Sequence, residues 1–504
     1  MTESTALSLL RRLRETLTAR SPYCSGTVEL SPANFELYYG KEDARFINLS
    51  QTANTEALGK LAQACDAAKF GRGTETVLDE TYRKAGKMDA ERFVTRLDVE
   101  DIGLLKAVNL GLLPRRDHKL NIRAELYKLN VYGEGAFFKP HRDTPRGKKM
   151  FGSLVVVFPT AHEGGALVLR HRGDEWTFDS AAMLAGRANS LAYVAFFSDV
   201  EHEVMPVVSG HRVTLTYNLY YGDRRKLAPT ARLKVRTPIN SNTYEVKDAL
   251  GALLSDPAFM PEGGTLGFGL NHSYAFPATC GDADWNPFKG LRRWLKGSDA
   301  VLYKAWTAMG MEPKFRLVSE HDIVLDHMVN LADWGQVECV ERALLKRHDG
   351  LVLKSKVFSG KDGALWREGD KYEDGDEYEG EIGGNSLTVY WVTNPSGGGP
   401  RSDYLHYGNE ASLGYFWTRV CILVDVPGVD ERCKTLGRES GKTATEEEDE
   451  DEDEEADEEE DEEEDEEQFE EQFEEQFEEQ FEEEEDEDEN EGEDEEDEAK
   501  NEKD

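Results

Sequence analysis

The sequence predicts a mainly β fold with flanking helices, of the jelly-roll or barrel type, joined to a second mixed α/β unit and a disordered acidic tail. Three observations support this. Apolar residues recur at helical spacing near the N-terminus, the period changes to two from residue 122, and acidic residues fill the last part of the chain. Many short strands at close spacing are typical of a jelly-roll or a closed barrel.

Two helical segments precede the strands. Residues 5–20 carry leucines at helical spacing with arginines between them, which predicts an amphipathic helix. Residues 55–70 follow Asn54, a candidate cap, and predict a second helix that packs against 90–99. We assign residues 1–39 to an N-terminal helical extension.

The catalytic domain is expected at 40–222, with its β core at 122–222. Within this core, short segments alternate apolar and polar residues and are separated by glycine-containing turns. The expected strands are 125–132, 151–159, 165–171, 175–179, 191–197, 202–207 and 212–221.

The rest of the chain divides by composition. Residues 223–244 are polar and contain prolines, which predicts a linker, and 245–435 predict a second mixed α/β domain. That domain contains no second His-x-Asp followed by a distant histidine, so we expect it to be non-catalytic. Residues 436–504 are the low-complexity tail.

The tail carries nearly all of the protein's net negative charge. The whole chain has a formal charge of −43, and residues 446–504 account for −42 of it, which leaves −1 for 1–445. Such acidic density predicts disorder and no direct nucleic-acid binding. A solvating role is the first interpretation, and capture of a basic protein is the alternative.

The cysteines and the N-terminus bear on location. Six cysteines are scattered without a CxxC pair, which fits a reducing compartment. There is no apolar signal-peptide core and no apolar run long enough for a membrane span. We therefore expect a soluble cytoplasmic or nuclear protein with no membrane association.

The strongest chemical signal is KPHRDTP followed by SDVEHEVMPVVSGHRVTLTY. Residues i and i+2 of a strand face the same side, so His141 and Asp143 can point into a barrel together. His202, 59 residues after Asp143, can supply a third ligand. Two imidazoles and one carboxylate are the ligand set of non-haem Fe(II) oxygenases. His211 is the competitor for the third position.

Arg212 lies ten residues after His202. A hairpin between them would offset the two side chains by about 10 Å, which suits a short dicarboxylate held between a metal and a guanidinium. Thr214 shares the strand face of Arg212 and can add a hydroxyl. Asp199 and Glu201 flank His202 and are candidates to orient its ring.

The stretch LYKLNVYGEGAFFKPHRDTP, with MFGSLVVVFP, HEGGALVLRH and the His202–Arg212 segment, resembles the Fe(II)/2-oxoglutarate oxygenase superfamily in its prolyl 4-hydroxylase-like branch, especially its fungal members. The resemblance implies a double-stranded β-helix, with iron on His141, Asp143 and His202 and the 5-carboxylate of 2-oxoglutarate on Arg212 and Thr214. It also implies O2 as co-substrate and ascorbate to keep the iron reduced.

Two departures concern the co-substrate and the substrate. Prolyl hydroxylases often carry a tyrosine where this chain has Phe138, and the strand at 150–159 lacks the tyrosine that some relatives direct at 2-oxoglutarate. Tyr132 and Ser153 are the candidates to replace it.

The resulting hypothesis is a dioxygenase that hydroxylates a C–H bond and releases succinate and CO2. The first expected substrate is a protein side chain, with proline ahead of others, and a basic protein is the expected kind of partner. The alternatives are a small-molecule oxygenase, a non-catalytic barrel scaffold and a protein that binds partners through its acidic tail.

Overall fold

The computed structural model describes residues 5–432 outside 19–20, 41–42, 51–54, 73–74, 114–120, 223–242, 278–287, 289, 320–321, 328–339, 360–364, 369–384 and 396–414. The expected acidic tail and nearly all of the expected linker lie outside the described residues. The described residues between 5 and 432 belong to one compact unit.

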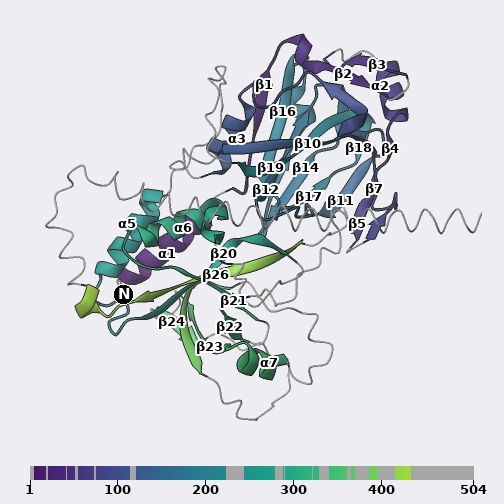
Figure 1. Cartoon of the computed structure of the whole chain (residues 1–504). Coiled ribbons are helices and arrows are strands. Elements are labelled where there is room, and N and C mark those ends of the chain that lie inside the picture. The colour runs from purple at the N-terminus through teal and green to yellow at the C-terminus, as the bar shows by residue number, and fades with distance from the viewer. Residues whose placement is uncertain are drawn as a thin grey trace, which may run out of the picture. The chain divides into compact units, whose positions relative to one another are not determined.

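Two β-sheets build the first half of the chain (Figure 1). The larger has seven strands among the described residues, in the order β1 (Tyr23–Glu29), β16 (Ser190–Phe197), β12 (Met150–Val157), β19 (Arg212–Gly222), β10 (Asn121–Tyr132), β8 (Gly86–Asp89) and β4 (Asp66–Ala67). The smaller follows the order β15 (Asp174–Phe178), β14 (Leu167–His171), β17 (Glu201–Val204), β11 (Phe137–His141) and β7 (Arg83–Lys84).

The two sheets share one hydrophobic core. Fully buried side chains of the larger sheet, such as Leu154 and Leu215, pack in the same cluster as Leu169 and Phe138 of the smaller one. Short strands β13 (His162–Gly164) and β18 (Val207–Gly210) pair with each other beside them. The prediction of a mainly β jelly-roll with flanking helices is confirmed.

The N-terminal residues differ from the predicted extension at 1–39. Strand β1 pairs with β16 along its whole length, from Tyr23 opposite Phe196 to Glu29 opposite Ser190. The preceding helix α1 (Thr5–Thr18) packs instead with α5 (Thr243–Ser255) in the core of the second sheet. The leucine stripe therefore marks packing surface rather than an appendage.

Residues 90–99, expected to be the packing partner of the helix at 55–70, are not helical over their length. Residues 90–92 form one 3₁₀ turn, and β9 (Phe93–Thr95) pairs with β2 (Glu36–Tyr39), which also pairs with β3 (Arg45–Asn48). The consecutive aromatic and β-branched residues at 93–95 favour a strand. The helix in this region is α3 (Leu104–Leu112), which begins after Gly103, and α2 (Thr55–Gln63) is shorter than predicted.

The second half of the chain contains another seven-stranded sheet in its described part. Its order is β22 (Ile323–Leu325), β21 (Lys314–Val318), β26 (Tyr415–Val426), β20 (Gly264–Pro277), β25 (Ser386–Thr393), β23 (Leu351–Phe358) and β24 (Trp366–Glu368). Helices α5, α6 (Gly297–Thr307) and α7 (Val340–Arg347) accompany it, so this part, here called the second sheet unit (residues 243–432), is mixed α/β as predicted.

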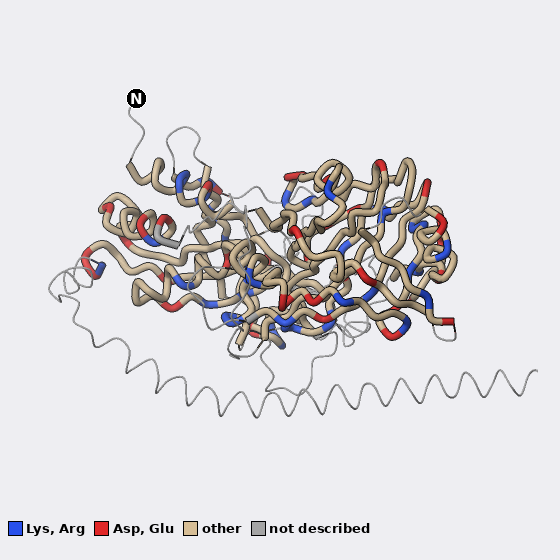
Figure 2. Tube along the Cα trace, turned by 90° about the horizontal axis from the view of Figure 1, so that it is seen from above, with Lys and Arg blue, Asp and Glu red and all other residues tan. Residues whose placement is uncertain are grey.

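Charge is distributed differently in the described chain and in the tail. Figure 2 shows lysine, arginine, aspartate and glutamate interspersed along the described trace. This agrees with the near-neutral net charge of residues 1–445. No helix of the described residues is both long and apolar enough to cross a membrane.

Candidate metal centre

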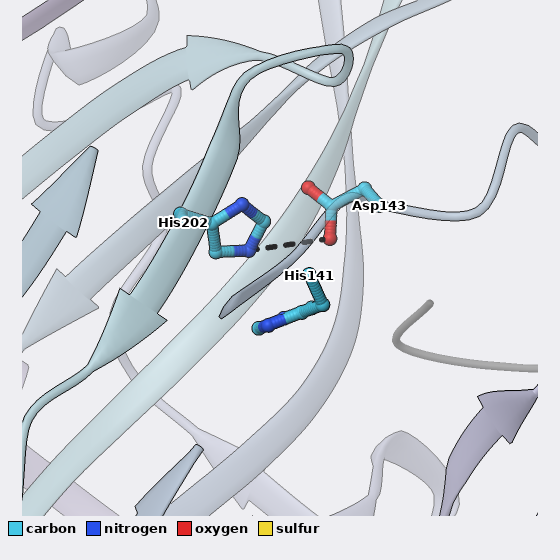
Figure 3. Close-up of side chains that lie close together, drawn as sticks. All are labelled: His141, Asp143 and His202. Carbon is cyan, nitrogen blue, oxygen red and sulfur yellow. Dashed lines mark ion pairs between the residues drawn. The ribbon is translucent and has the colours of Figure 1, made fainter. Parts of the chain in front are cut away.

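Three side chains from two neighbouring strands meet at one point (Figure 3). His141 ends β11 and lies directly opposite His202 of β17 in the antiparallel ladder, and Asp143 follows β11 by two residues. The imidazole centroids are 4.2 Å apart, and His202 Nε2 lies 3.8 Å from Asp143 Oδ1. One ligand atom from each residue lies within 4.8 Å of the others.

Backbone carbonyls orient both imidazoles. His141 Nδ1 lies 2.9 Å from the carbonyl oxygen of Lys139, and His202 Nδ1 lies 3.0 Å from that of Val200. A carbonyl only accepts, so each Nδ1 carries a proton, and in a neutral imidazole Nε2 is then the nitrogen with a lone pair for a metal ion. This second contact is the usual way in which metal-binding histidines are fixed.

Burial favours the neutral, ligating form of the first histidine. His141, His202 and Asp143 are each no more than 6% exposed. Burial, and then the neighbouring His202, lowers the pKa of His141 well below its usual value. Ser153 Oγ donates to Asp143 Oδ2 at 2.5 Å, so this serine, expected at the co-substrate, also holds the carboxylate.

Tyr132, Arg212 and Thr214 line the same pocket as the three clustered residues. Tyr132 lies opposite Arg212 in the β10–β19 ladder, and the guanidinium carbon lies 5.5 Å from the tyrosine ring centre. Residues of both sheets line this pocket, so it lies between them.

Arg212 is a buried cation whose guanidinium is largely unsatisfied. The residue is 1% exposed, and its Nε and Nη2 have no hydrogen-bond partner among the described residues. Burial lowers its pKa. Because an unpaired buried charge is costly, such a group is suited to receive an anion. A carboxylate can accept both free N–H groups.

The predicted hairpin between His202 and Arg212 is wrong. His202 lies in β17 of the smaller sheet and Arg212 in β19 of the larger one, with β18 between them in the chain. The two residues line the same pocket from different sheets and do not lie on adjacent strands. The turn at PVVSG therefore leads from one sheet to the other.

The other histidine considered as a ligand stays outside the cluster. His211 accepts from Thr160 Oγ1 through its backbone oxygen, and its ring approaches Gly133. The two acids beside His202 do not bond to its ring either. The carbonyl oxygen of Val200 accepts the hydrogen bond from the His202 ring instead. Asp199 is buried against residues of the second sheet unit, and a carboxylate oxygen of Glu201 lies 4.0 Å from a guanidinium nitrogen of Arg170.

The pocket contains basic residues that the sequence interpretation missed. Lys128 and Asn130 alternate with Tyr132 along β10, so the period-two rule would have placed them on its face. Arg83 comes from the two-residue strand β7, where no sequence pattern signals a site. Its guanidinium lies 4.3 Å from the Phe138 ring centre and donates to Asn130 Oδ1 at 3.1 Å.

Comparisons with known proteins agree with this geometry. Residues 127–220 match the family model described as the 2OG-Fe(II) oxygenase superfamily. None of the curated proteins matches the sequence.

Three solved structures illustrate the likeness. A prolyl-4-hydroxylase from Pseudomonas putida is 17% identical, with 42% of this chain and 99% of that chain covered and a TM-score of 0.25. An oxidoreductase of the 2OG-Fe(II) oxygenase family from Burkholderia pseudomallei is 16% identical (44% and 96% covered, TM-score 0.22). A Trichoplax adhaerens prolyl hydroxylase in complex with a hypoxia inducible factor peptide fragment is 16% identical (44% and 94% covered, TM-score 0.24).

The family match spans the strands that carry His141, Asp143, His202 and Arg212. Residues 127–220 therefore match the 2OG-Fe(II) oxygenase superfamily, and this match with the His–Asp–His cluster supports a 2-oxoglutarate-dependent dioxygenase that uses Fe(II), 2-oxoglutarate and O2.

Proposed function

We propose that His141, Asp143 and His202 hold Fe(II), and that Arg212, with Tyr132 and Thr214, binds the 5-carboxylate of 2-oxoglutarate. The observation that carries this proposal is the buried, largely unsatisfied Arg212 guanidinium in the same pocket as the three clustered side chains. A dicarboxylate between the two would satisfy the arginine at one end and complete a metal's coordination at the other.

The donor set fits ferrous iron. Two neutral imidazoles and one carboxylate on one side of an ion suit non-haem Fe(II) and leave positions open for co-substrates. When bound, the iron supplies the activation of O2 that is coupled to decarboxylation of 2-oxoglutarate and to C–H hydroxylation.

The chain's own residues then bind and orient. Lys139 and Val200 carbonyls keep both Nε2 atoms directed at the ion, and Ser153 keeps Asp143 from rotating. The sheets exclude water around Arg212, which strengthens its attraction for a carboxylate. The arginine's planar fork would hold the 5-carboxylate of the dicarboxylate through two hydrogen bonds and so would set the direction of the molecule.

The substrate we propose is a protein side chain, with proline the first candidate. The support is the resemblance of the segment around His141 to the prolyl 4-hydroxylase-like branch. The guanidinium groups of Arg83 and Arg212 line the pocket and make its interior cationic, so a lysine- or arginine-rich segment would not enter. A basic partner would instead meet the acidic tail.

A small-molecule substrate is the second candidate. The same cationic lining favours a compound with an acidic group, because the Arg83 side chain is 3% exposed and would hold an anion out of water. Hydroxylation of a free acid, with no oxygen added to any protein, would support this candidate over the first.

The proposal is tested by reconstituting the protein without oxygen, adding Fe(II) and 2-oxoglutarate, and measuring succinate after oxygen is admitted. We expect His141→Ala and Arg212→Ala to lose succinate formation and His211→Ala, a neighbouring histidine outside the cluster, to keep it. Mass spectrometry of proteins trapped by the wild type would reveal an added oxygen. Turnover that survives in His141→Ala would refute the ligand assignment.

A further inference from the structure

The second sheet unit touches the segment that carries Asp143. Trp417 of β26 donates from its indole Nε1 to the backbone oxygen of Asp143 at 3.1 Å, and both residues are buried. This hydrogen bond joins residues 274 positions apart. It fixes the peptide next to a proposed ligand in a segment that has already left strand β11.

The same unit also holds the segment that leads to His202. Asp199, three residues before His202, is 4% exposed. Its carboxylate accepts from Lys296 Nζ at 3.2 Å and from the backbone N–H of Ser273 at 3.0 Å. His272 Nδ1 lies 3.3 Å from each carboxylate oxygen.

One ammonium group connects these two contacts. Lys296 Nζ lies 4.6 Å from the Trp417 ring centre and donates to the Ser273 carbonyl oxygen at 3.0 Å. Lys296 is itself 2% exposed, so its charge is balanced by the Asp199 carboxylate in a place that water hardly reaches. Trp417, Lys296 and Asp199 thus form one connected group, here called the clamp.

A second metal site is the other interpretation of this region. His171, Asp199 and His272 offer ligand atoms within 4.8 Å of one another. The Lys296 ammonium already neutralises Asp199, however, and a divalent cation there would lie beside a buried positive charge. The geometry therefore favours a structural ion pair over a cation site.

We propose that Trp417 and Lys296 are positioning residues for the metal centre, and that the second sheet unit is required for tight metal binding. The clamp holds the backbone beside Asp143 and the turn before His202 at a fixed separation. A tridentate site gains affinity when its ligands are held in place before the ion arrives. This inference rests on the proposed assignment of the ligands.

The test measures metal binding by the full chain without turnover. Binding of Mn(II) is followed by calorimetry, and the absorption spectrum of bound Co(II) reports the geometry of the ligands. Trp417→Phe keeps the ring and removes the N–H that reaches Asp143. We expect it to weaken Mn(II) binding by about tenfold, in the range for residues that orient ligands, and to change the Co(II) spectrum.

The chain offers a matched control. Trp391 is fully buried in the second sheet unit, and its Nε1 donates to Ser355 Oγ at 3.2 Å. It belongs to a hydrophobic cluster separate from the core shared by the two sheets that carry the proposed metal site. Trp391→Phe removes an equivalent hydrogen bond. We expect it to lower thermal stability about as much as Trp417→Phe and to leave Mn(II) affinity and the Co(II) spectrum unchanged.

A second variant addresses the other half of the clamp. Lys296→Met combined with Asp199→Asn removes both charges together and leaves neither buried alone. It should also weaken Mn(II) binding, and it decides the matter if Trp417→Phe does not fold. If the folded variants bound Mn(II) with wild-type affinity and kept the wild-type Co(II) spectrum, and His141→Ala still abolished binding, the positioning role of the clamp would be refuted. Failure of the wild type to bind Mn(II) would instead refute the ligand assignment.

Discussion

At the scale of single residues, we expect replacement of Arg212 to raise the stability of the free protein and to weaken its binding of 2-oxoglutarate. The Arg212→Leu variant removes a buried charge that has little to pair with, so we expect the protein without co-substrate to unfold at a higher temperature. The same change should weaken 2-oxoglutarate binding by at least about tenfold, since each charge-assisted hydrogen bond contributes about 1.5–3 kcal/mol.

Thermal unfolding with and without 2-oxoglutarate and a metal checks both the expected stability and the expected loss of binding. The wild type should gain stability on addition of the dicarboxylate and the leucine variant should not. Arg212→Lys keeps the charge but loses the planar fork, so its response should lie between them. A leucine variant that 2-oxoglutarate stabilises as much as the wild type would contradict the assignment.

Lys128 makes stability depend on pH in a defined window. Burial, with the charges of Arg83, Lys87 and Arg146, lowers its pKa to about 6 from 10.5. Between these values the unfolded chain binds a proton that the folded chain does not, so stability due to this group rises with pH from about 6 to 10.5. The slope is at most about 1.4 kcal/mol per pH unit.

Denaturant unfolding of the wild type and Lys128→Met at several pH values between 6.5 and 9 measures this term. The difference in unfolding free energy between the two proteins should shrink as pH rises. Lys60→Met is the control, because Lys60 is exposed and pairs with Glu56 within one helix. Parallel pH profiles for the wild type and Lys128→Met would contradict the prediction.

The limits of sequence reasoning are visible among these residues. His141, Asp143, Arg212 and Thr214 could be chosen because period-two alternation and ligand chemistry are local properties. Lys128 followed from the same alternation once Tyr132 was placed, yet it was missed. Arg83 could not be found, since a two-residue strand from outside the β core brings it to the pocket and only the three-dimensional pairing determines that.

At the scale of elements, helix α1 is part of the second core. Leu7, Leu10, Leu13 and Leu17 are at most 4% exposed and pack with α5, while the following strand β1 belongs to the first sheet. We expect Leu10→Ala to destabilise the protein by about 2–5 kcal/mol, as for other buried leucines.

Denaturant unfolding of Leu10→Ala beside Ser8→Ala, an exposed position of the same helix, measures that cost. Under the clamp proposal, loosening the second core should also weaken Mn(II) binding. A leucine variant as stable as Ser8→Ala would show that the leucines of α1 contribute little to the second core.

The errors at this scale have a common cause. Residues 93–95, within the segment expected to pack against the helix at 55–70, form a strand because β2 offers a pairing edge. The hairpin predicted after His202 is absent because β18 pairs with β13. Propensity and turn residues describe a segment by itself. Partners distant in the chain decide between outcomes of similar local energy.

At the scale of the whole molecule, the number and spacing of the predicted strands were enough to predict the jelly-roll. The role of the second sheet unit could not be predicted from the sequence. Its contacts with Asp143 and Asp199 come from single side chains on β20, β26 and the turn before α6, and from one backbone N–H of β20. No motif marks Trp417 or Lys296, because one hydrogen bond or ion pair between distant residues leaves no periodic signal in a sequence.

The acidic tail gives the last prediction. Deletion of residues 446–504 removes a charge of −42 and should leave succinate formation unchanged, because every proposed site residue lies before residue 215. The same deletion should abolish binding to polylysine, and salt should weaken that binding in the full chain, since the Debye length is about 10 Å at 0.1 M. Binding isotherms at two salt concentrations, with succinate assays on both proteins, separate the two roles. If the truncated protein lost turnover, the tail would belong to the catalytic apparatus, and if it kept its polylysine binding, the basic partner would be captured by the folded units instead.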